Sequence, residues 1–189
     1  MKNPLKMAVS GDAGSFSEEA GLLYASKNNI DPVREYLIDM EGVLAAVDSG
    51  KVDIGIFPVV NKRGGLVRMA FDAMGKYSFK VIDELWLDVK QCLLVRKDMM
   101  HDDIKKIVSH SQALLQCKPW LQTRLKNAEL IESQDTAKSA RELADGKLQA
   151  GSAVIAPRRA AEIYGLKILD SSIQDDNPNL TAFIIVTRL

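Results

Sequence analysis

The sequence predicts an α/β fold with mostly parallel sheets. Segments of strand character alternate with segments of helix character along the chain, which is typical of parallel strands connected by helices. Residues 52–60 are almost continuously apolar, as expected of a parallel strand that is buried on both faces. The 189 residues, 47% of them hydrophobic and 26% charged, are enough for one domain or two small lobes.

In the first half of the chain, glycines and polar loops separate the expected elements. Residues 6–10 form a short apolar strand, and a loop at 11–15 leads into a helix at 17–26 with acids in its first turn, where the helix dipole favours them. Gly50 and Gly75 each end a helix. The other expected elements are a strand at 33–37, a helix at 41–49, the strand at 52–60 and, after Gly64 and Gly65, a helix at 66–74.

The second half continues the alternation. A strand at 105–109 enters a helix through a Ser-His-Ser-Gln segment, and Gly165 ends a helix at 158–164. The irregular stretch at 76–93 is where one lobe could pass to another. The other expected elements are strands at 79–87, 90–95, 129–133, 153–156, 166–173 and 181–187 and a helix at 136–144.

Composition excludes several classes of function. Lys+Arg and Asp+Glu are both 25, so the chain lacks the positive surplus of a nucleic-acid-binding or anionic-membrane-binding protein. No apolar run approaches the roughly 20 residues that span a bilayer, and no signal peptide is expected. We expect Cys92 and Cys117 to be buried thiols of a cytoplasmic protein. With no ligand cluster in the sequence, no metal and no cofactor are expected.

Four loops at strand ends are candidates for binding a small anion: residues 11–17, 61–65, 109–112 and 135–136. Each offers backbone N–H groups and short polar side chains at a helix start. Helix capping alone would also explain Ser17, Ser109 and Asp135, so each loop by itself leaves both interpretations open.

Taken together and in order, six segments resemble the catalytic domain of prephenate dehydratase. The resemblance covers about residues 7–186 with its spacing preserved. The segments are Gly-Asp-Ala-Gly-Ser-Phe-Ser-Glu-Glu-Ala at 11–20, Val-Asp-Ile-Gly-Ile-Phe-Pro-Val-Val-Asn at 52–61, Ser-His-Ser-Gln-Ala-Leu at 109–114, Thr-Ala at 136–137, Tyr-Gly-Leu at 164–166 and Asn-Leu-Thr-Ala-Phe at 179–183.

The resemblance implies a two-lobed, periplasmic-binding-protein-like (type II) fold with a cleft between the lobes. The expected lobes are residues 1–82 plus 172–189, and residues 83–171, without a C-terminal regulatory domain. It implies a cytoplasmic homodimer that binds a small anionic carboxylic acid. The implied reaction is the decarboxylating dehydration of prephenate, or a close cyclohexadienyl keto acid, to phenylpyruvate in phenylalanine biosynthesis.

The same resemblance implies the roles of individual residues. Thr181 matches the threonine that gives a proton or a hydrogen bond to the leaving ring hydroxyl. Phe183 is expected to shape an apolar pocket, and the others to position the carboxylates and the ring. The residues expected to bind substrate are Ser15, Ser17, Asn61, Lys62, Ser109, His110, Gln112, Asp135, Thr136, Asn179, Ala182 and Phe183.

The chain departs from the family pattern at the implied site. Ala182 replaces the motif arginine, a bidentate partner for carboxylate, and Val60 replaces a glutamate. Lys62 and Asp135 replace serines, and Arg63 adds a second cation. Either Lys62 or Arg63 compensates for the arginine, or the pocket serves another purpose. The alternatives are a prephenate decarboxylase, an enzyme acting on another carboxylic acid, and a small-molecule binder without catalysis.

Overall fold

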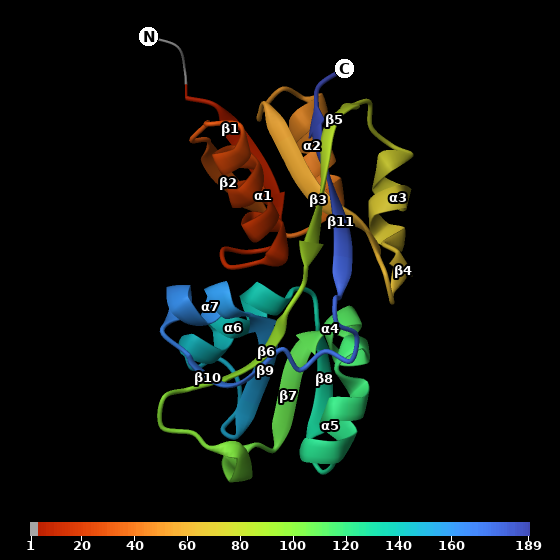
Figure 1. Cartoon of the computed structure of the whole chain (residues 1–189). Coiled ribbons are helices and arrows are strands. Elements are labelled where there is room, and N and C mark those ends of the chain that lie inside the picture. Colours follow the sequence, from red (N-terminus) through yellow and green to blue (C-terminus); the bar gives the residue numbers. More distant parts are fainter. Residues whose placement is uncertain (1–3) are drawn as a thin grey trace. The chain divides into compact units, whose positions relative to one another are not determined.

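The computed structural model describes residues 4–189, which form two compact units (Figure 1). Unit 1 contains the chain up to Asp12, Phe16–Asp88 and Leu180–Leu189, and unit 2 contains Ala13–Ser15 and Val89–Asn179. Both passages between the units lie later in the sequence than the expected 82/83 and 171/172. The reason is that the strand ending at Asp88 stays paired, through Asp88 and Leu180, with the strand that re-enters unit 1.

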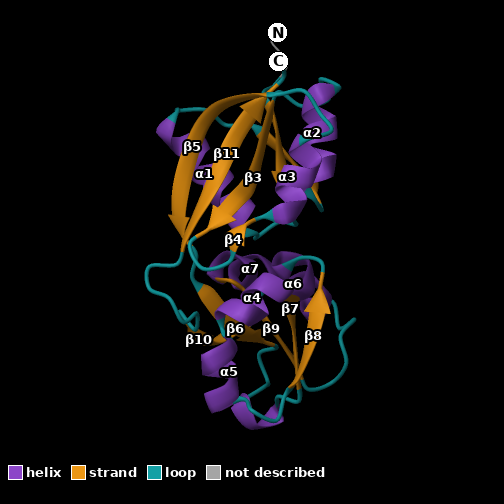
Figure 2. Ribbon diagram, turned by 90° about the vertical axis from the view of Figure 1, so that its right-hand side faces the viewer, coloured by secondary structure: helices purple, strands orange, loops and turns teal. Residues whose placement is uncertain are grey.

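Unit 1 is built on one sheet with the strand order β2-β1-β3-β11-β5, and a short β4 pairs with β3. One face of this sheet packs on helix α1 (Phe16–Lys27), and the other on α2 (Met40–Asp48) and α3 (Arg68–Met74) (Figure 2). The strands are β1 (Lys6–Ser10), β2 (Val33–Leu37), β3 (Ile54–Asn61), β4 (Gly65–Leu66), β5 (Lys80–Asp88) and β11 (Leu180–Thr187).

Close packing fixes α2 on this sheet. A Cβ at Gly55 in β3 would lie 2.8 Å from Val43 Cγ1 and 2.9 Å from Val47 Cγ2, both on α2. Such distances are far inside van der Waals contact, so only glycine lets the helix approach this closely.

Unit 2 repeats the layered plan with the strand order β10-β6-β9-β7-β8. Helices α4 (Ser111–Gln116) and α5 (Lys118–Arg124) pack on one face, and α6 (Thr136–Ala144) and α7 (Arg158–Tyr164) on the other. The strands are β6 (Gln91–Val95), β7 (Lys106–His110), β8 (Glu129–Ser133), β9 (Ser152–Pro157) and β10 (Lys167–Ser171), and a 3-10 turn, η1 (His101–Asp103), precedes β7.

The α/β class is confirmed, and each sheet is mixed because one of its main strands runs against the others. In unit 1, β11 is antiparallel to both of its neighbours, β3 and β5. In unit 2, β6 is antiparallel to β9 and β10. Both reversed strands are the ones by which the chain enters a unit, at 88/89 and 179/180. An apolar run predicts a buried strand but not its direction, which is why the sequence did not reveal the reversal.

Several local predictions about helices, turns and cysteines are tested directly. Helices α6 and α7 have the predicted bounds, whereas residues 61–65 form a hairpin between β3 and β4 and not a strand-to-helix loop. Cys92 and Cys117 are both buried and form no disulfide. Within residues 4–189, no helix has the length and apolarity to cross a membrane, and no group of three or more His, Cys, Asp or Glu side chains could hold a metal ion.

Candidate functional site

In unit 1, Asn61 and Thr181 lie side by side at the end of the sheet where β1 and β3 end and β11 begins. They are direct cross-strand partners. Asn61 Nδ2 donates a hydrogen bond of 2.8 Å to Thr181 Oγ1, and both side chains are 7% exposed. Because this bond uses the hydroxyl oxygen as an acceptor, the hydroxyl proton is left to point toward another acceptor. This edge, at the carboxyl ends of parallel strands, is where open α/β sheets place their ligands.

The remaining polar groups of Asn61 are also engaged. Its Oδ1 accepts the backbone N–H groups of Arg63 at 3.0 Å and Gly64 at 2.8 Å, which forms the turn of the hairpin. Its Nδ2 also lies 3.3 Å from the backbone oxygen of Leu180. We therefore assign to Asn61 the orientation of the Thr181 hydroxyl instead of the expected direct contact with a ligand.

Two departures from the family pattern lie side by side in the sheet. Val60 and Ala182, which stand where the family has glutamate and arginine, are direct cross-strand partners. Side chains in such a pair lie about 4.5–5.5 Å apart at Cβ, so a glutamate and an arginine at these positions are close enough to form an ion pair. Replacing both partners together leaves no buried charge unpaired.

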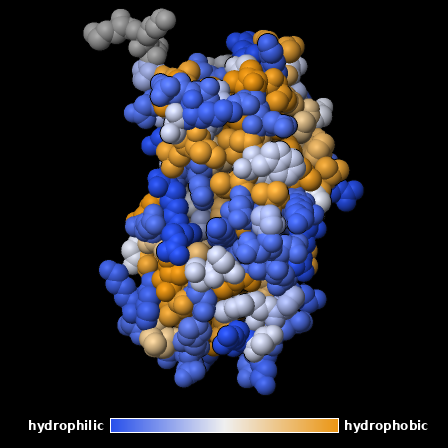
Figure 3. Space-filling model, in the orientation of Figure 1, coloured by the Kyte–Doolittle hydropathy of each residue, from blue (hydrophilic) through white to orange (hydrophobic). Residues whose placement is uncertain are grey.

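The replacement extends an apolar row across the sheet. Leu66 on β4 pairs with Val60, and Trp86 on β5 pairs with Ala182. Leu66 is 65% exposed and Trp86 52% exposed, and Figure 3 shows hydrophobic surface on this unit. This apolar row lies on the face of the sheet that packs on α2 and α3, whereas Thr181 lies on the face that packs on α1, because successive residues of a strand alternate between faces.

At the end of β1, the hydroxyl groups of two serines are hydrogen-bonded to each other. Ser17 and Ser10 share a hydrogen bond of 2.8 Å between their Oγ atoms, and both are buried. Nearby, Tyr36 donates to the buried carboxylate of Glu18 at 2.6 Å, and burial followed by this bond raises the pKa of Tyr36. Ser17 thus makes an internal contact that joins β1 to the start of α1.

In unit 2, His110 and Gln112 lie where β7 gives way to α4. His110 is the N-cap of α4, and its Nδ1 accepts the backbone N–H of Gln112 at 3.2 Å. Burial lowers the pKa of His110, although the nearby carboxylates of Asp135 and Glu132 act in the opposite direction. The Gln112 side chain is exposed and the His110 ring is partly accessible, so both remain candidates for binding.

Asp135 and Thr136 occupy the start of α6. Asp135 is the N-cap, and its Oδ1 accepts the backbone N–H of Lys138 at 2.7 Å. The capping interpretation that the sequence left open therefore applies to Asp135, while Thr136, the first residue of the helix, is half-buried.

Four further residues that were expected to bind substrate are buried. Ser109 is fully buried and donates to the backbone oxygen of Ile155 at 2.6 Å, so it joins β7 to β9. Phe183 is 1% exposed and belongs to the core under α1. Ser15 is 4% exposed, next to a glycine whose Cβ would meet Ala160 Cα at 2.8 Å. Asn179 is 1% exposed.

Asn179 belongs to a cluster of buried amides that the sequence did not reveal. Its Nδ2 donates to Gln116 Oε1 at 3.0 Å and to the backbone oxygen of Val89 at 3.2 Å. Gln91 Nε2 donates to the same Gln116 oxygen at 3.1 Å, and Gln174 Oε1 accepts the N–H of Gln91 at 3.0 Å. The cluster ties together the first and last segments of unit 2. Such partners are far apart in sequence, so no local pattern could predict them.

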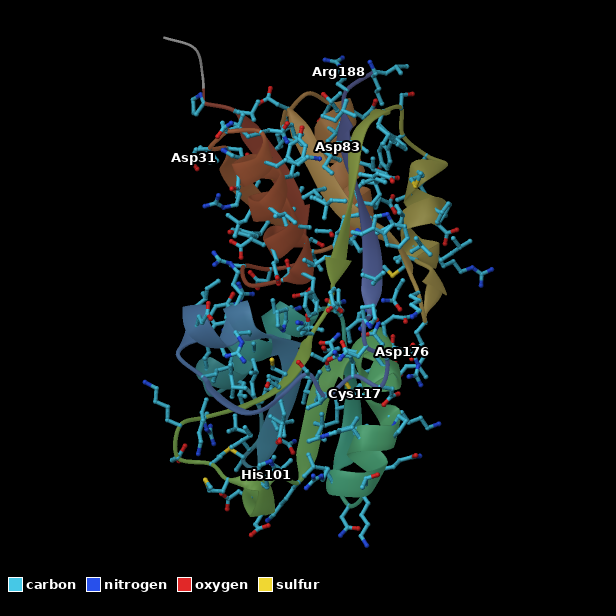
Figure 4. All side chains as sticks on the ribbon, in the orientation of Figure 1. Asp31, Asp83, His101, Cys117, Asp176 and Arg188 are labelled. Carbon is cyan, nitrogen blue, oxygen red and sulfur yellow. The ribbon has the colours of Figure 1, made fainter. Side chains whose placement is uncertain are left out.

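His101, the second histidine, lies away from these groups. Figure 4 shows it near the start of β7, whereas His110 ends that strand. Its Nε2 is 2.5 Å from Asp170 Oδ2, and both side chains are partly exposed. Asp170 lies on β10, an outer strand of the unit 2 sheet that β6 and β9 separate from β7.

Comparisons with known proteins agree with this fold. The family model described as prephenate dehydratase matches residues 7–189. Arogenate dehydratase/prephenate dehydratase 1 of Arabidopsis thaliana is 34% identical over 97% of this chain and 45% of its own length. The chain thus spans about half the length of this curated relative.

Solved structures show the same architecture. Prephenate dehydratase from Arthrobacter aurescens, in complex with L-Phe, has a TM-score of 0.85 and 27% identity over 98% of this chain and 60% of its own. A putative methionine-binding lipoprotein from Bacillus subtilis has a TM-score of 0.52 at 14% identity over 98% and 83%, a likeness of fold alone. The chain belongs to the prephenate dehydratase family and has its two-sheet, periplasmic-binding-protein-like α/β fold.

Proposed function

We propose that the chain catalyses the decarboxylating dehydration of prephenate or of a closely similar cyclohexadienyl acid such as arogenate. The observation that carries the proposal is the 2.8 Å hydrogen bond from Asn61 to Thr181 at the edge of the unit 1 sheet. Family membership and relatives named as arogenate and prephenate dehydratases support the same reaction class.

The proposed chemistry needs one well-directed hydroxyl. Loss of the ring carboxylate as carbon dioxide releases an electron pair that completes the aromatic ring and expels the ring hydroxyl. The Thr181 hydroxyl donates a hydrogen bond to that oxygen as negative charge develops on it. Asn61 occupies the acceptor side of the hydroxyl, which leaves its donor side for the substrate.

The loss of charge at positions 60 and 182 favours a second candidate. Val60 and Ala182 are cross-strand partners at the positions where the family pattern has a glutamate and an arginine. A site without these two charges could bind a ring acid and remove only its carboxylate, or bind it without reaction. Decarboxylation without dehydration needs no donor at the ring hydroxyl, so a Thr181 held by Asn61 supports the dehydratase instead.

Product analysis separates the candidates. Purified protein is incubated with prephenate and, in parallel, with arogenate, and products are identified by chromatography and mass. Phenylpyruvate from prephenate, or phenylalanine from arogenate, supports the dehydratase. A product that has lost carbon dioxide and kept its hydroxyl supports a decarboxylase, and unchanged substrate that still raises the melting temperature supports a binder.

The expected homodimer and cytoplasmic location stay predictions. The outer strand of the unit 1 sheet, β5, exposes Val81, Ile82 and Trp86, and a sheet edge of this kind can pair with a second chain. Sedimentation at several concentrations tests the dimer.

A further inference from the structure

A groove in unit 2, which we call the α5–β8 groove, lies where helices α4 and α5 pack beside strand β8. These two helices form the crossover from the end of β7 to the start of β8, so they run back along the strand. The groove has a volume of about 320 Å³, which is in the range of small-molecule sites. All of its lining residues lie between Ser111 and Glu132, within unit 2, so it shares no residue with the Asn61–Thr181 pair of unit 1.

Side chains at helical spacing form one wall of the α5–β8 groove. Leu121 lies three residues after Lys118, and Leu125 lies four residues after Leu121, the intervals that bring side chains to one face of a helix. Leu121 is buried in the core of unit 2, whereas Leu125 is half-buried. Leu115, which lines the groove from α4, is 48% exposed. The apolar stripe of these helices is thus wider than the core beneath it, and its outer part faces the groove.

Strand alternation supplies the opposite wall. Leu130 and Glu132 are two residues apart on β8, so their side chains point to the same face of the sheet, and both line the groove. Ile131, between them, packs on the other face against the core beneath α6 and α7. Leu130 is nevertheless 47% exposed, because β8 is the outermost strand of its sheet. The groove is therefore open along this edge of the sheet.

The lining of the α5–β8 groove combines aliphatic side chains with two lysines. Its apolar part consists of leucines and one alanine, and no aromatic side chain of the described residues lines it, so it suits a flexible hydrocarbon tail better than a ring that needs a stacking partner. The ammonium groups of Lys118 and Lys126 make no ion pair or hydrogen bond within residues 4–189. Because Glu132 is the one acid among the described lining residues, the lining carries an excess of positive charge. An apolar interior with this excess is complementary to an aliphatic carboxylate.

The charges also favour one orientation of such a ligand. Lys126 lies in the turn before β8 begins, and Glu132 lies near the end of that strand, so groups of opposite charge mark the two ends of the groove. A strand rises about 3.3 Å per residue, so Glu132 lies about 10 Å along β8 from the first residue of the strand. A carboxylate is therefore attracted to the Lys126 end and repelled from the Glu132 end, and its hydrocarbon tail follows Leu130.

We propose that the α5–β8 groove binds an aliphatic monocarboxylate of medium length, with its carboxylate at Lys118 and Lys126 and its tail against Leu115, Leu125 and Leu130. The tail covers leucines that the fold leaves exposed and connects the helices to the outer strand, so binding should stabilise unit 2. The inference is independent of the proposed function, because no residue of the groove has a role in the proposed dehydration.

Octanoate is the probe, and its binding to the whole chain is measured by isothermal titration calorimetry. Two compounds with a tail of the same length separate charge from apolar burial, because octanamide is neutral and octylammonium is positive. The Kd of octanoate should be at least about 10-fold lower than that of either compound. The melting temperature of the protein should also rise with the concentration of octanoate.

Two variants that introduce a negative charge locate the site. Lys126→Glu and Leu130→Glu should each raise the Kd of octanoate about 10-fold or more, because the first repels the carboxylate and the second places a charge against the hydrocarbon tail. A circular dichroism melt shows whether each variant is folded. Leu115→Glu, on the opposite wall, takes the place of Leu130→Glu if the latter does not fold.

Lys97→Glu and Ile163→Glu are the matched controls. Lys97 is an exposed lysine and Ile163 is a 43% exposed apolar residue, and both belong to unit 2 without lining the groove. Each control repeats the chemical change of one test variant at a distant position. Both should keep the Kd of octanoate within about 3-fold of wild type.

Three results would overturn the inference. One is an octanoate Kd no lower than that of octanamide, since the lysines would then contribute nothing to binding. Another is a Kd that stays within about 3-fold of wild type in both Lys126→Glu and Leu130→Glu, which would place octanoate elsewhere on the protein. The third is no binding of octanoate at millimolar concentration together with a dimer, seen by sedimentation, that dissociates in Leu130→Glu. That result would assign the groove to a second copy of the chain.

Discussion

Exchanging Asn61 for aspartate would isolate the orientation of the Thr181 hydroxyl from the stability of the turn. The variant Asn61→Asp keeps an oxygen in place of Oδ1, which still accepts the N–H groups of Arg63 and Gly64. It replaces the donor Nδ2 by a second oxygen, so the hydrogen bond of 2.8 Å to Thr181 Oγ1 can form only if Thr181 donates. The hydroxyl proton then points into the protein and away from the substrate.

The expected effects on stability and on kcat differ in size. The Asn61 side chain makes the four hydrogen bonds described above and the residue is 7% exposed, so Asn61→Ala should lower the free energy of unfolding by about 2–4 kcal/mol. Asn61→Asp keeps the two bonds of the turn and, with Thr181 as the donor, the bond to Thr181, and should cost about 1–2 kcal/mol, partly because its charge lies near the Leu180 oxygen. Its kcat should nevertheless fall about 10²–10⁴-fold, the usual contribution of a positioned proton donor.

Initial rates with prephenate, followed by the ultraviolet absorbance of phenylpyruvate in alkali, measure kcat and KM, and urea denaturation measures stability. Lys80→Ala is the matched surface control. A kcat for Asn61→Asp within about 3-fold of wild type, with the protein folded, would refute the reasoning that Asn61 directs the hydroxyl.

Two further predictions concern stability. The folded-state pKa of His110 lies below its unfolded value of 6.5, mainly because of burial. As the pH falls, the unfolded chain therefore binds the proton before the folded chain does. The free energy of unfolding should fall as the pH drops below about 6.5 and level off below the folded pKa. In His110→Asn, which keeps a capping side chain, denaturant titrations between pH 4 and 8 should lose this part of the dependence, and an unchanged profile would exclude His110 as its source. Gly55→Ala should destabilise unit 1 by about 1–3 kcal/mol, because the added methyl group meets Val43 and Val186 side chains at 2.8 and 3.0 Å; an unchanged melting temperature would show that α2 is less closely packed.

Local chemistry made much of the fold predictable. Helices α6 and α7 have the bounds that the sequence indicated, because Asp135 caps the first and Gly165, at φ 66°, ends the second. The direction of β6 and β11 was not predictable, because both strands pair with segments remote in sequence. Apolar patterning specifies burial and period, and carries no information on strand direction.

The candidate site was predictable as a set of motifs and not as a set of contacts. The motifs indicated Asn61 and Thr181, but their hydrogen bond joins residues 120 positions apart. Ser109, Phe183 and Asn179 resemble ligand contacts in the sequence and are buried in the structure. Val60 and Ala182 looked like two independent losses of charge until the register made them partners.

A comparison of Thr181→Ser with Thr181→Val tests the account most directly. Serine keeps the hydroxyl that Asn61 holds, whereas valine replaces it with a methyl group of similar size. The account predicts that Thr181→Ser keeps prephenate dehydration within about 10-fold of wild type while Thr181→Val loses about 10²–10⁴-fold in kcat. Full dehydratase activity in a folded Thr181→Val protein would contradict it.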